Sequence, residues 1–445
     1  MRKLFVVLTL AVVSACSSGS GDGSGGVPVS SCSVDGQKQF IVDAMRQWYL
    51  WNDSLPAQVD LSQYATPEDV LEFLKTFSPP GSDGQPVDRS FSFITTAAAD
   101  TARFSQGEFE GFGFVFEFVA ADDVRLAKVF SGSPADAGGL ERGQQILSLN
   151  GRTIAEIQAA EGIYAVLDTS PVDFEMRRLD ASEFMSTIAQ ATVTIDPVPQ
   201  WRIIDAGGGR NVGYIELASF ILPAEPAMDT VFQSFNAAGV NDVVIDLRYN
   251  GGGLVSTSNL LGDYFGGDVA ENLTFSKTFF NADRAADNNT VEFFARLANS
   301  VSLSSLVAIT TDGTASASEL VINGMEPHVN VALVGSDTFG KPVGQVGLEF
   351  CGNLLRAVAF ETVNANDEGG YFDGLPVDCA ASDDLSIPVG ADNDPNLVTS
   401  LTYLDTGSCP VVSMPKAEAA SFGPTKALPE VDRRGPPERE FLRAF

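Results

Sequence analysis

The sequence predicts a mixed α/β protein of several domains: a helical N-terminal region, a strand-rich middle module and an α/β core. Three observations lead to this prediction. Apolar residues recur at helical spacing near residue 40, short alternating apolar runs fill residues 107–195, and strand-like runs alternate with helical ones from residue 210 onward. With 445 residues, 44% of them hydrophobic, the chain has enough apolar side chains for two or three cores.

The charge balance argues against nucleic acid as a partner. The chain has 58 acidic and 27 basic residues, which gives a formal net charge of -31. Such a charge repels phosphate backbones. The acidic residues are spread along the sequence and form no long run, so we interpret them as a solvated surface.

The first sixteen residues have the pattern of an export signal. Arg2 and Lys3 precede an apolar stretch, residues 4–13, that is too short to span a bilayer. The following Val-Ser-Ala-Cys resembles a bacterial lipobox, which would make Cys16 the lipidated N-terminus; an ordinary signal peptide is the alternative. Residues 17–33, which begin with a Gly/Ser-rich run, would then tether the protein to a membrane. We expect a cell-envelope protein, lipid-anchored in the outer membrane and facing the periplasm or the cell surface.

The remaining cysteines predict disulfides. An exported chain folds in an oxidising compartment, and four cysteines can pair in three ways, among which the sequence does not choose. Metal binding is not expected, because no CxxC spacing occurs and His328 is the only histidine. The four are Cys32, Cys351, Cys379 and Cys409.

Residues 34–90 are expected to be a small helical region. Apolar side chains at 40, 41, 44, 45 and 48 share one helical face. A second helix should begin at Thr66, which has the N-cap residue type and is followed by Pro67 and two acids. The Pro/Gly/Ser/Asp-rich stretch 78–88 ends this region.

The middle module, residues 107–195, contains two glycine motifs. Gly111, Phe112, Gly113 and Phe114 form a Gly-Phe-Gly-Phe turn, and SPADAGGL at 133–140 leads to RGQQILSLNG at 142–151. Together they resemble a circularly permuted PDZ domain of bacterial proteases. The resemblance implies that the Gly-Phe-Gly-Phe amides bind a peptide's terminal carboxylate, and that the adjacent strand edge takes the peptide as an extra strand.

The α/β core is expected over residues 200–390, with an extension over 391–445 whose last twenty or so residues form a loosely ordered tail. Two buried runs, 306–311 and 331–334, each lead into a polar motif. Strand ends are where α/β proteins place their chemistry.

Ser316 stands at one of these strand-to-helix corners. A serine nucleophile needs a base for its proton and N–H donors for the oxyanion. The amide of Ala317 and one amide of the 251–253 glycine loop, with Gly251 and Gly252 as candidates, would supply the donors. Two other interpretations remain: Ser316 caps its helix through a Ser-x-x-Glu capping box, or Ser318 is the nucleophile.

Lys341 is the candidate base. His328 would lie beyond the helix that starts at Ser316, so a Ser/His/Asp triad is not favoured. A lysine can act when burial lowers its pKa, and Phe339, Pro342 and Val343 surround Lys341 with apolar side chains.

These motifs together resemble the carboxyl-terminal processing (tail-specific) proteases. That family takes its nucleophile from the first serine of Ser-Ala-Ser-Glu and its base from Thr-Phe-Gly-Lys, which correspond to Ser316 and Lys341, 341 − 316 = 25 residues apart. The resemblance covers residues 35–370 and implies that Gln345 orients the lysine. This sequence departs from the family in having Pro342 after the lysine and Gly344 before the glutamine.

The resemblance implies a serine endopeptidase that acts through an acyl-enzyme on exported polypeptides captured by their C-termini. It needs no metal or nucleotide, and the sequence does not predict an oligomeric state. The alternative is a non-catalytic lipoprotein that holds peptides or apolar ligands on the same fold, and a weaker one is an esterase or amidase that uses the same pair of residues.

Overall fold

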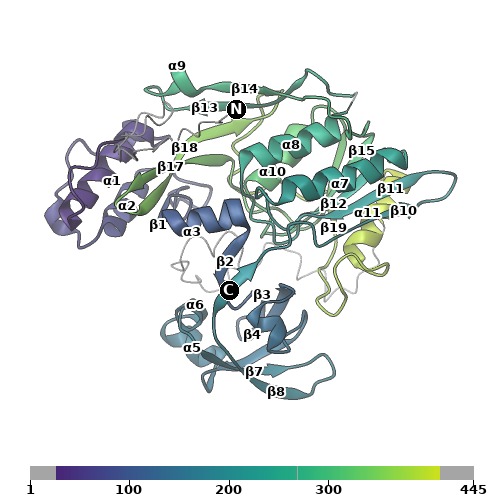
Figure 1. Cartoon of the computed structure of the whole chain (residues 1–445), viewed down its shortest axis with the longest axis horizontal. Coiled ribbons are helices and arrows are strands. Elements are labelled where there is room, and N and C mark those ends of the chain that lie inside the picture. The colour runs from purple at the N-terminus through teal and green to yellow at the C-terminus, as the bar shows by residue number, and fades with distance from the viewer. Residues whose placement is uncertain (1–26, 268, 411–445) are drawn as a thin grey trace, which may run out of the picture.

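The computed structural model describes residues 27–267 and 269–410, so Cys16 and its surroundings lie outside the described residues. Three parts are visible: N-terminal helices at one end, a middle module at the bottom and a large α/β core (Figure 1). The mixed α/β fold is confirmed. None of the described helices has the length and apolarity needed to cross a membrane.

The N-terminal region consists of short helices. Thr66 caps α2 in a capping box, as its sequence indicates. Phe40 of α1 stacks on Phe350 of the core with ring centroids 4.7 Å apart, and a disulfide joins Cys32 to Cys351. The region is therefore fastened to the core. Its elements are α1 (Val34–Trp48), η1 (Asn52–Ser54), η2 (Leu61–Gln63), α2 (Pro67–Lys75), β1 (Phe93–Thr96), α3 (Ala97–Thr101) and η3 (Ala102–Gln106).

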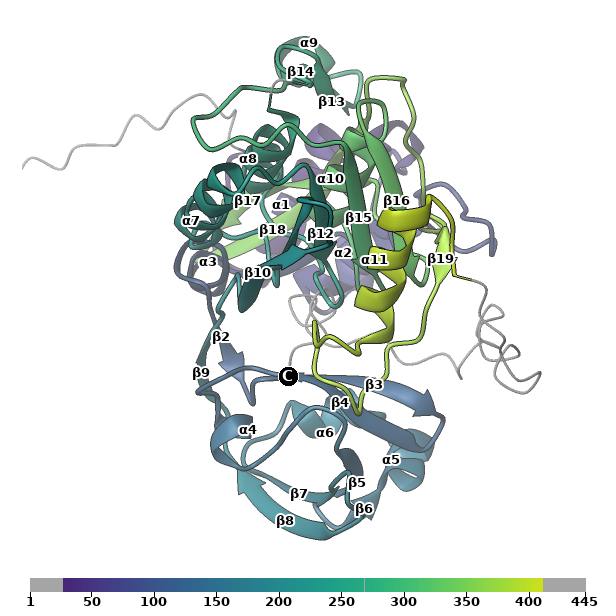
Figure 2. The same ribbon diagram turned by 90° about the vertical axis from the view of Figure 1, so that its right-hand side faces the viewer.

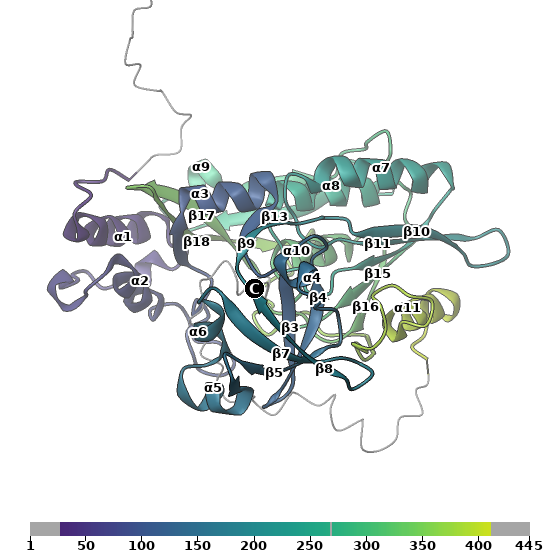
Figure 3. The same cartoon turned by 60° about the horizontal axis from the view of Figure 1, so that its bottom comes forward.

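The middle module has a sheet and a hydrophobic core of its own. The paired strands β2 and β9 connect it to the rest of the chain (Figure 2). Its own strands β3, β4, β5, β7 and β8 are labelled in Figure 3 and follow the order β3-β4-β5-β7-β8, with β6 paired to β5. Strand β3 is an edge of this sheet. The elements are β2 (Glu108–Gly111), β3 (Phe114–Ala120), β4 (Asp123–Val129), α4 (Pro134–Ala137), β5 (Gln145–Leu149), β6 (Arg152–Thr153), α5 (Ile154–Ala160), α6 (Ile163–Leu167), β7 (Val172–Arg177), β8 (Glu183–Ile188) and β9 (Ala191–Thr194).

A six-stranded sheet in the order β10-β11-β12-β15-β16-β19 forms the centre of the core. All neighbouring pairs are parallel except β10 with β11. Helices α7 and α8 lie on one side and α11 on the other (Figure 2). Successive residues of β12 therefore face different cores: Val243 and Ile245 face one, and Val244 faces the other. The elements are β10 (Gln200–Asp205), β11 (Asn211–Glu216), α7 (Ala224–Ala237), β12 (Asp242–Asp246), α8 (Val255–Gly266), β15 (Ser305–Thr310), α10 (Ala317–Met325), β16 (Asn330–Gly335), β19 (Cys379–Ala380) and α11 (Pro395–Thr406).

A second sheet, in the order β1-β18-β13-β14 with β17 paired to β18, joins the N-terminal region to the core. Strand β1 pairs with β18 from Phe93 to Thr96, so the N-terminal region contributes a strand to the sheet that carries Gln345 on β17. The remaining elements are β13 (Thr274–Phe280), α9 (Ala285–Asn288), β14 (Thr290–Phe293), β17 (Val343–Phe350) and β18 (Asn353–Val363).

The core extends further along the chain than the predicted boundary at residue 390. Helix α11 packs on the central sheet through the fully buried Leu397, and a disulfide joins Cys379 of β19 to Cys409. Assigning all of 391–445 to an extension is therefore wrong for residues 395–409. The polar residues of α11 made its narrow apolar face difficult to recognise in the sequence.

Candidate active site

Ser316 occupies the corner between β15 and α10 in a strained backbone conformation. Its φ is 57° and its ψ is -113°, a region that residues with a side chain rarely adopt. The residue is half-buried. The Ser-x-x-Glu pattern forms a capping box at this corner: Glu319 Oε2 accepts the Ser316 backbone N–H at 2.8 Å, and the Ser316 side chain faces the backbone N–H of Glu319. The corner thus presents an accessible hydroxyl at a strained turn, as nucleophile elbows do.

Ser318 is not available as a nucleophile. Its side chain is fully buried, and its hydroxyl donates to the carbonyl oxygen of Asn250 at 2.9 Å. The geometry therefore separates the two serines of the motif: Ser318 fastens the helix to the glycine loop, and Ser316 faces the site.

Glu319 connects the serine corner to the lysine loop. Its Oε2 accepts the backbone N–H groups of Ser316 at 2.8 Å and Lys341 at 2.9 Å. Its Oε1 accepts the Thr338 hydroxyl at 2.5 Å and the Gly340 amide at 2.7 Å. Burial raises the pKa of this fully buried carboxyl, and the four hydrogen bonds oppose that effect. The sequence showed Glu319 only as part of a capping box; its contacts with the lysine loop were missed.

Lys341 is buried, with only 4% of its surface exposed. Burial lowers its pKa from 10.5 to about 7, and the positive charge of Arg356 acts in the same direction. The negative charges of Asp88 and Glu319 oppose the shift. A substantial fraction of the amine is therefore neutral near pH 7.

Gln345 meets the lysine despite the two departures from the family pattern. Its Oε1 accepts from Lys341 Nζ at 3.2 Å, and its Nε2 donates to the carbonyl oxygen of Phe91. A side chain at Gly344 would come within 2.1 Å of the Phe360 ring, which explains the glycine there. In the described residues no hydrogen bond joins Ser316 Oγ to Lys341 Nζ, a geometry common in sites without substrate.

The structure corrects one of the predicted oxyanion donors. The amide of Gly252 donates to Asn250 Oδ1 at 2.9 Å, so it is not directed at a substrate, and the assignment of Gly252 is wrong. The amides of Gly251 and Ala317 have no acceptor within the described chain. Gly252 has a steric role: a Cβ on it would lie 2.8 Å from the Ala317 nitrogen and 2.9 Å from the Ser316 Cβ.

His328 has a structural role away from the dyad. It lies beyond the C-terminal end of α10, a helix about 14 Å long. Its Nε2 is 2.8 Å from the carbonyl oxygen of Thr274, and its ring packs edge-on against Phe294. Ser316 is at the opposite end of the same helix.

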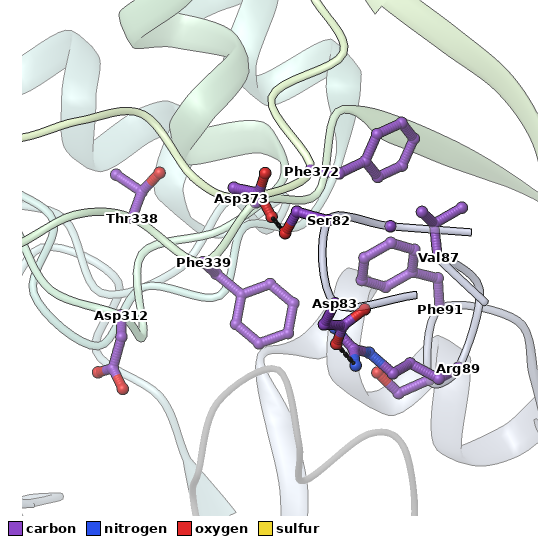
Figure 4. A pocket seen from close by; sticks show the side chains of 13 residues that line it. Ser82, Asp83, Val87, Arg89, Phe91, Asp312, Thr338, Phe339, Phe372 and Asp373 are labelled. Atoms are coloured by element: carbon purple, nitrogen blue, oxygen red, sulfur yellow. Dashed lines mark hydrogen bonds and ion pairs between the residues drawn. The ribbon is translucent and has the colours of Figure 1, made fainter. Parts of the chain in front are cut away.

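A cavity of about 260 Å³ lies beside the lysine loop (Figure 4). Its walls combine aromatic rings with carboxylates from three separate segments of the chain. Two contacts hold its edge: Ser82 Oγ donates to Asp373 at 2.6 Å, and Asp83 pairs with Arg89. The side chains labelled in the close-up are Ser82, Asp83, Val87, Arg89, Phe91, Asp312, Thr338, Phe339, Phe372 and Asp373.

The predicted carboxylate-binding loop, residues 111–114, lies in the middle module and outside the serine–lysine site. Phe112 and Phe114 are fully buried in the module's core. Gly113 has a φ of 89°, and a Cβ there would be 2.2 Å from the Ser133 Cβ. The loop leads directly into the edge strand β3.

The described residues contain no cluster of histidine, cysteine or acidic side chains with the arrangement of a metal site.

Comparison with known families gives two matches. The peptidase family S41 model matches residues 211–376, and the peptidase S41 N-terminal domain model matches residues 36–93. The two matched segments contain the serine corner, the lysine loop and Phe91.

Curated relatives and solved structures agree with these matches. The carboxyl-terminal-processing protease of Synechocystis is 26% identical over 271 residues, which are 59% of this chain and 60% of the relative. The carboxy-terminal processing protease CtpA of Bacillus subtilis is 21% identical over 385 residues, 84% of this chain and 76% of the relative. The chain thus spans less than two thirds of the Synechocystis protein.

Two solved structures share the fold. A putative S41 protease from Bacteroides fragilis superposes with a TM-score of 0.64 at 24% identity, covering 82% of this chain and 97% of that one. The photosystem II D1 C-terminal processing protease gives a TM-score of 0.50 at 17% identity, covering 79% and 94%. With both family models matched in the expected order along one chain, this protein belongs to peptidase family S41 and is a relative of the carboxyl-terminal processing proteases.

Proposed function

We propose that the protein is a serine endopeptidase with Ser316 as nucleophile and Lys341 as general base. The observation that carries the proposal is the pair of hydrogen bonds to Glu319 Oε2, which bring a strained, accessible serine next to a buried lysine. Membership of a peptidase family supports the reaction class.

The reaction begins with the neutral amine of Lys341 taking the proton of the Ser316 hydroxyl as Oγ attacks the scissile carbonyl carbon. The amides of Ala317 and Gly251 donate to the oxyanion of the tetrahedral intermediate. When the C–N bond breaks, the Lys341 ammonium gives its proton to the leaving amine. Water, deprotonated by the same lysine, then attacks the acyl carbon, and when the C–O bond to Ser316 breaks the Lys341 ammonium returns the proton to Oγ.

The middle module is proposed to capture the substrate as a PDZ-like domain. The position of β3 at the edge of its sheet supports this, because an edge strand can pair with an extended peptide. Phe116 on β3 is buried, and its ring centroid lies 5.7 Å from that of Tyr164 on α6, so this edge strand is held in place by packing against a helix of the module. The substrate class is unfolded polypeptide bound by its C-terminus.

We also propose lipid anchoring through Cys16 and residence in the cell envelope, at the outer membrane. The lipobox-like sequence supports the anchor. The two disulfides, Cys32 with Cys351 and Cys379 with Cys409, support an oxidising compartment.

The test is cleavage of an unfolded protein by the full-length chain, together with labelling by a fluorophosphonate and mass mapping of the labelled residue. Wild type should cleave and be labelled at Ser316, whereas Ser316→Ala and Lys341→Ala should lose cleavage by at least about 1,000-fold. Ser318→Ala is the matched control and should retain the label. Peptide binding without cleavage or labelling by wild type would favour the non-catalytic binding protein.

A further inference from the structure

A segment of the N-terminal region, Asp88–Ser92, lies directly against the proposed base. We propose that Phe91 is a positioning residue for Lys341: its carbonyl oxygen fixes the amide of Gln345 and its ring covers the amine. This inference rests on the proposed function, because it concerns the same lysine. It assigns the N-terminal region a part in the chemistry of the core.

The segment is held by a compact set of buried hydrogen bonds. Asp88 is fully buried and accepts the Ser92 amide at 2.7 Å and the Ser92 hydroxyl at 2.6 Å. The Asp88 amide donates to Ser78 Oγ at 3.0 Å. Ser92 Oγ accepts the Val358 amide of β18 at 3.0 Å. The backbone around Phe91 is thus fixed to the sheet that carries Gln345.

The Phe91 carbonyl determines which end of the Gln345 amide faces the lysine. A carbonyl oxygen can only accept, so it must take the NH₂ end, and Gln345 Nε2 is the atom it contacts. The Oε1 end then faces Lys341 Nζ at 3.2 Å. The reversed amide would place an NH₂ group against the lysine and an oxygen against the carbonyl. The glutamine therefore accepts a hydrogen bond from the lysine and does not donate one to it.

The Phe91 ring shields the amine from water. The ring is buried, with 5% of its surface exposed, and Lys341 Nζ lies 5.5 Å from its centroid. Phe91 packs against Phe339 with centroids 6.1 Å apart, and both rings line the cavity beside the lysine loop (Figure 4). Phe91 thus stands between that cavity and the base. Removing the ring would open the amine to solvent.

Charged groups from three elements act on the same amine. Asp88 of the N-terminal segment and Glu319 of α10 favour the ammonium, and Arg356 of β18 disfavours it. Arg356 is itself paired with Asp100 at 2.6 Å. Removing the Phe91 ring should consequently raise the pKa of Lys341, and removing the Asp88 charge should lower it.

The experiment measures the rate of inactivation by a fluorophosphonate, a probe without a titrating group, against pH for the full-length protein. Phe91→Ala should move the midpoint of the wild-type profile about one pH unit upward, since water stabilises the ammonium. Asp88→Asn should move it downward, because a negative charge is removed. Phe91→Leu still covers the amine with an apolar side chain, so the midpoint of its pH profile should lie close to that of wild type. Phe73→Ala removes a half-buried ring in the same region, between Tyr64 and Phe77, and should leave the midpoint unchanged.

The outcomes separate this inference from the proposed function. If wild type is not labelled at Ser316, the proposed function fails. If wild type is labelled and the Phe91→Ala and Asp88→Asn proteins react more slowly with an unmoved midpoint, the segment only stabilises the fold and the inference is overturned. Opposite shifts in the two variants, with Phe73→Ala unshifted, support the inference.

Discussion

Ser316 and Lys341 donate their backbone N–H groups to one carboxylate oxygen, Glu319 Oε2, at 2.8 and 2.9 Å. The two residues come from different strand ends, after β15 and after β16, and are 25 positions apart. A single buried carboxylate therefore holds the backbones of Ser316 and Lys341 close together without using their side chains, which the proposed reaction needs.

Replacing Glu319 with glutamine should damage both stability and catalysis. Glu319 receives four donors, and a carboxamide would turn an NH₂ group toward some of them. We expect Glu319→Gln to lose about 2–3 kcal/mol of unfolding free energy and nearly all cleavage. Urea unfolding and a cleavage assay measure both.

The control is Glu326→Gln, at the residue that directly follows α10. Glu326 is exposed, and partial desolvation of its carboxyl together with the charges of Glu368 and Asp378 raises its pKa to about 7. Neutralising it should leave stability unchanged or slightly higher. Equal losses in both variants would show that the effect comes from removing any acid at this helix and not from the four hydrogen bonds of Glu319.

Lys341→Met should abolish cleavage and stabilise the fold. Burial lowers the pKa of Lys341 from 10.5 to about 7, so the unfolded chain binds one more proton than the folded chain between these pH values. The lysine's contribution to unfolding free energy therefore increases from pH 7 to 10.5 and is least favourable below pH 7. The variant should gain about 3 kcal/mol at pH 7, with a smaller gain at pH 9.5. Urea unfolding at both pH values measures this. A loss of stability at pH 7 would contradict the conclusion that Lys341 is buried with a lowered pKa.

Short sequence motifs predicted two local features that the structure shows: the side chains of Lys341 and Gln345 meet, and Thr66 and Pro67 begin α2. The catalytic roles of Ser316 and Lys341 stay predictions. Phe91 was not predicted, because its role depends on a backbone carbonyl that any residue type possesses. The direction of the Gly252 amide likewise depends on the Asn250 side chain and not on the glycine pattern.

Gly252→Ala should impair catalysis more than stability. Gly252 has a φ of 97°, and a Cβ would meet the Ala315 oxygen at 2.7 Å and the Ala317 nitrogen at 2.8 Å. The added methyl group should displace the serine corner and its oxyanion amide, reducing kcat/KM by at least about 100-fold. The control for backbone strain alone is Gly207→Ala, because Gly207 has a φ of 83° and open space around it. This variant should lose about 1 kcal/mol of unfolding free energy and keep normal activity. Similar kcat/KM values for the two variants would contradict this prediction.

Asp383→Asn should loosen the middle module from the core. Asp383 accepts from Arg142 of the module at 2.6 Å, from Arg248 at 2.7 Å and from the Tyr249 hydroxyl. Tyr249, with a φ of 62°, lies two residues before the 251–253 glycine loop, so this carboxylate joins the module to the segment that leads into that loop. We expect a loss of about 2 kcal/mol of unfolding free energy, because the buried guanidinium of Arg248 loses one of the carboxylates that neutralise it.

The control for this interdomain contact is Glu183→Gln, which removes an exposed ion pair with Arg177 inside the module and should cost less than about 1 kcal/mol. Limited proteolysis of the full-length protein gives a second measurement. Asp383→Asn should be cut sooner than wild type near the β2 and β9 connections, because the module then keeps fewer polar contacts with the core, among them Arg142 with the backbone of Ile387 and Lys128 with Glu216. If both variants are cut at the wild-type rate and unfold alike, Asp383 does not hold the module, and its other contacts with the core, such as Arg142 with Tyr249 at 3.0 Å, are sufficient without it.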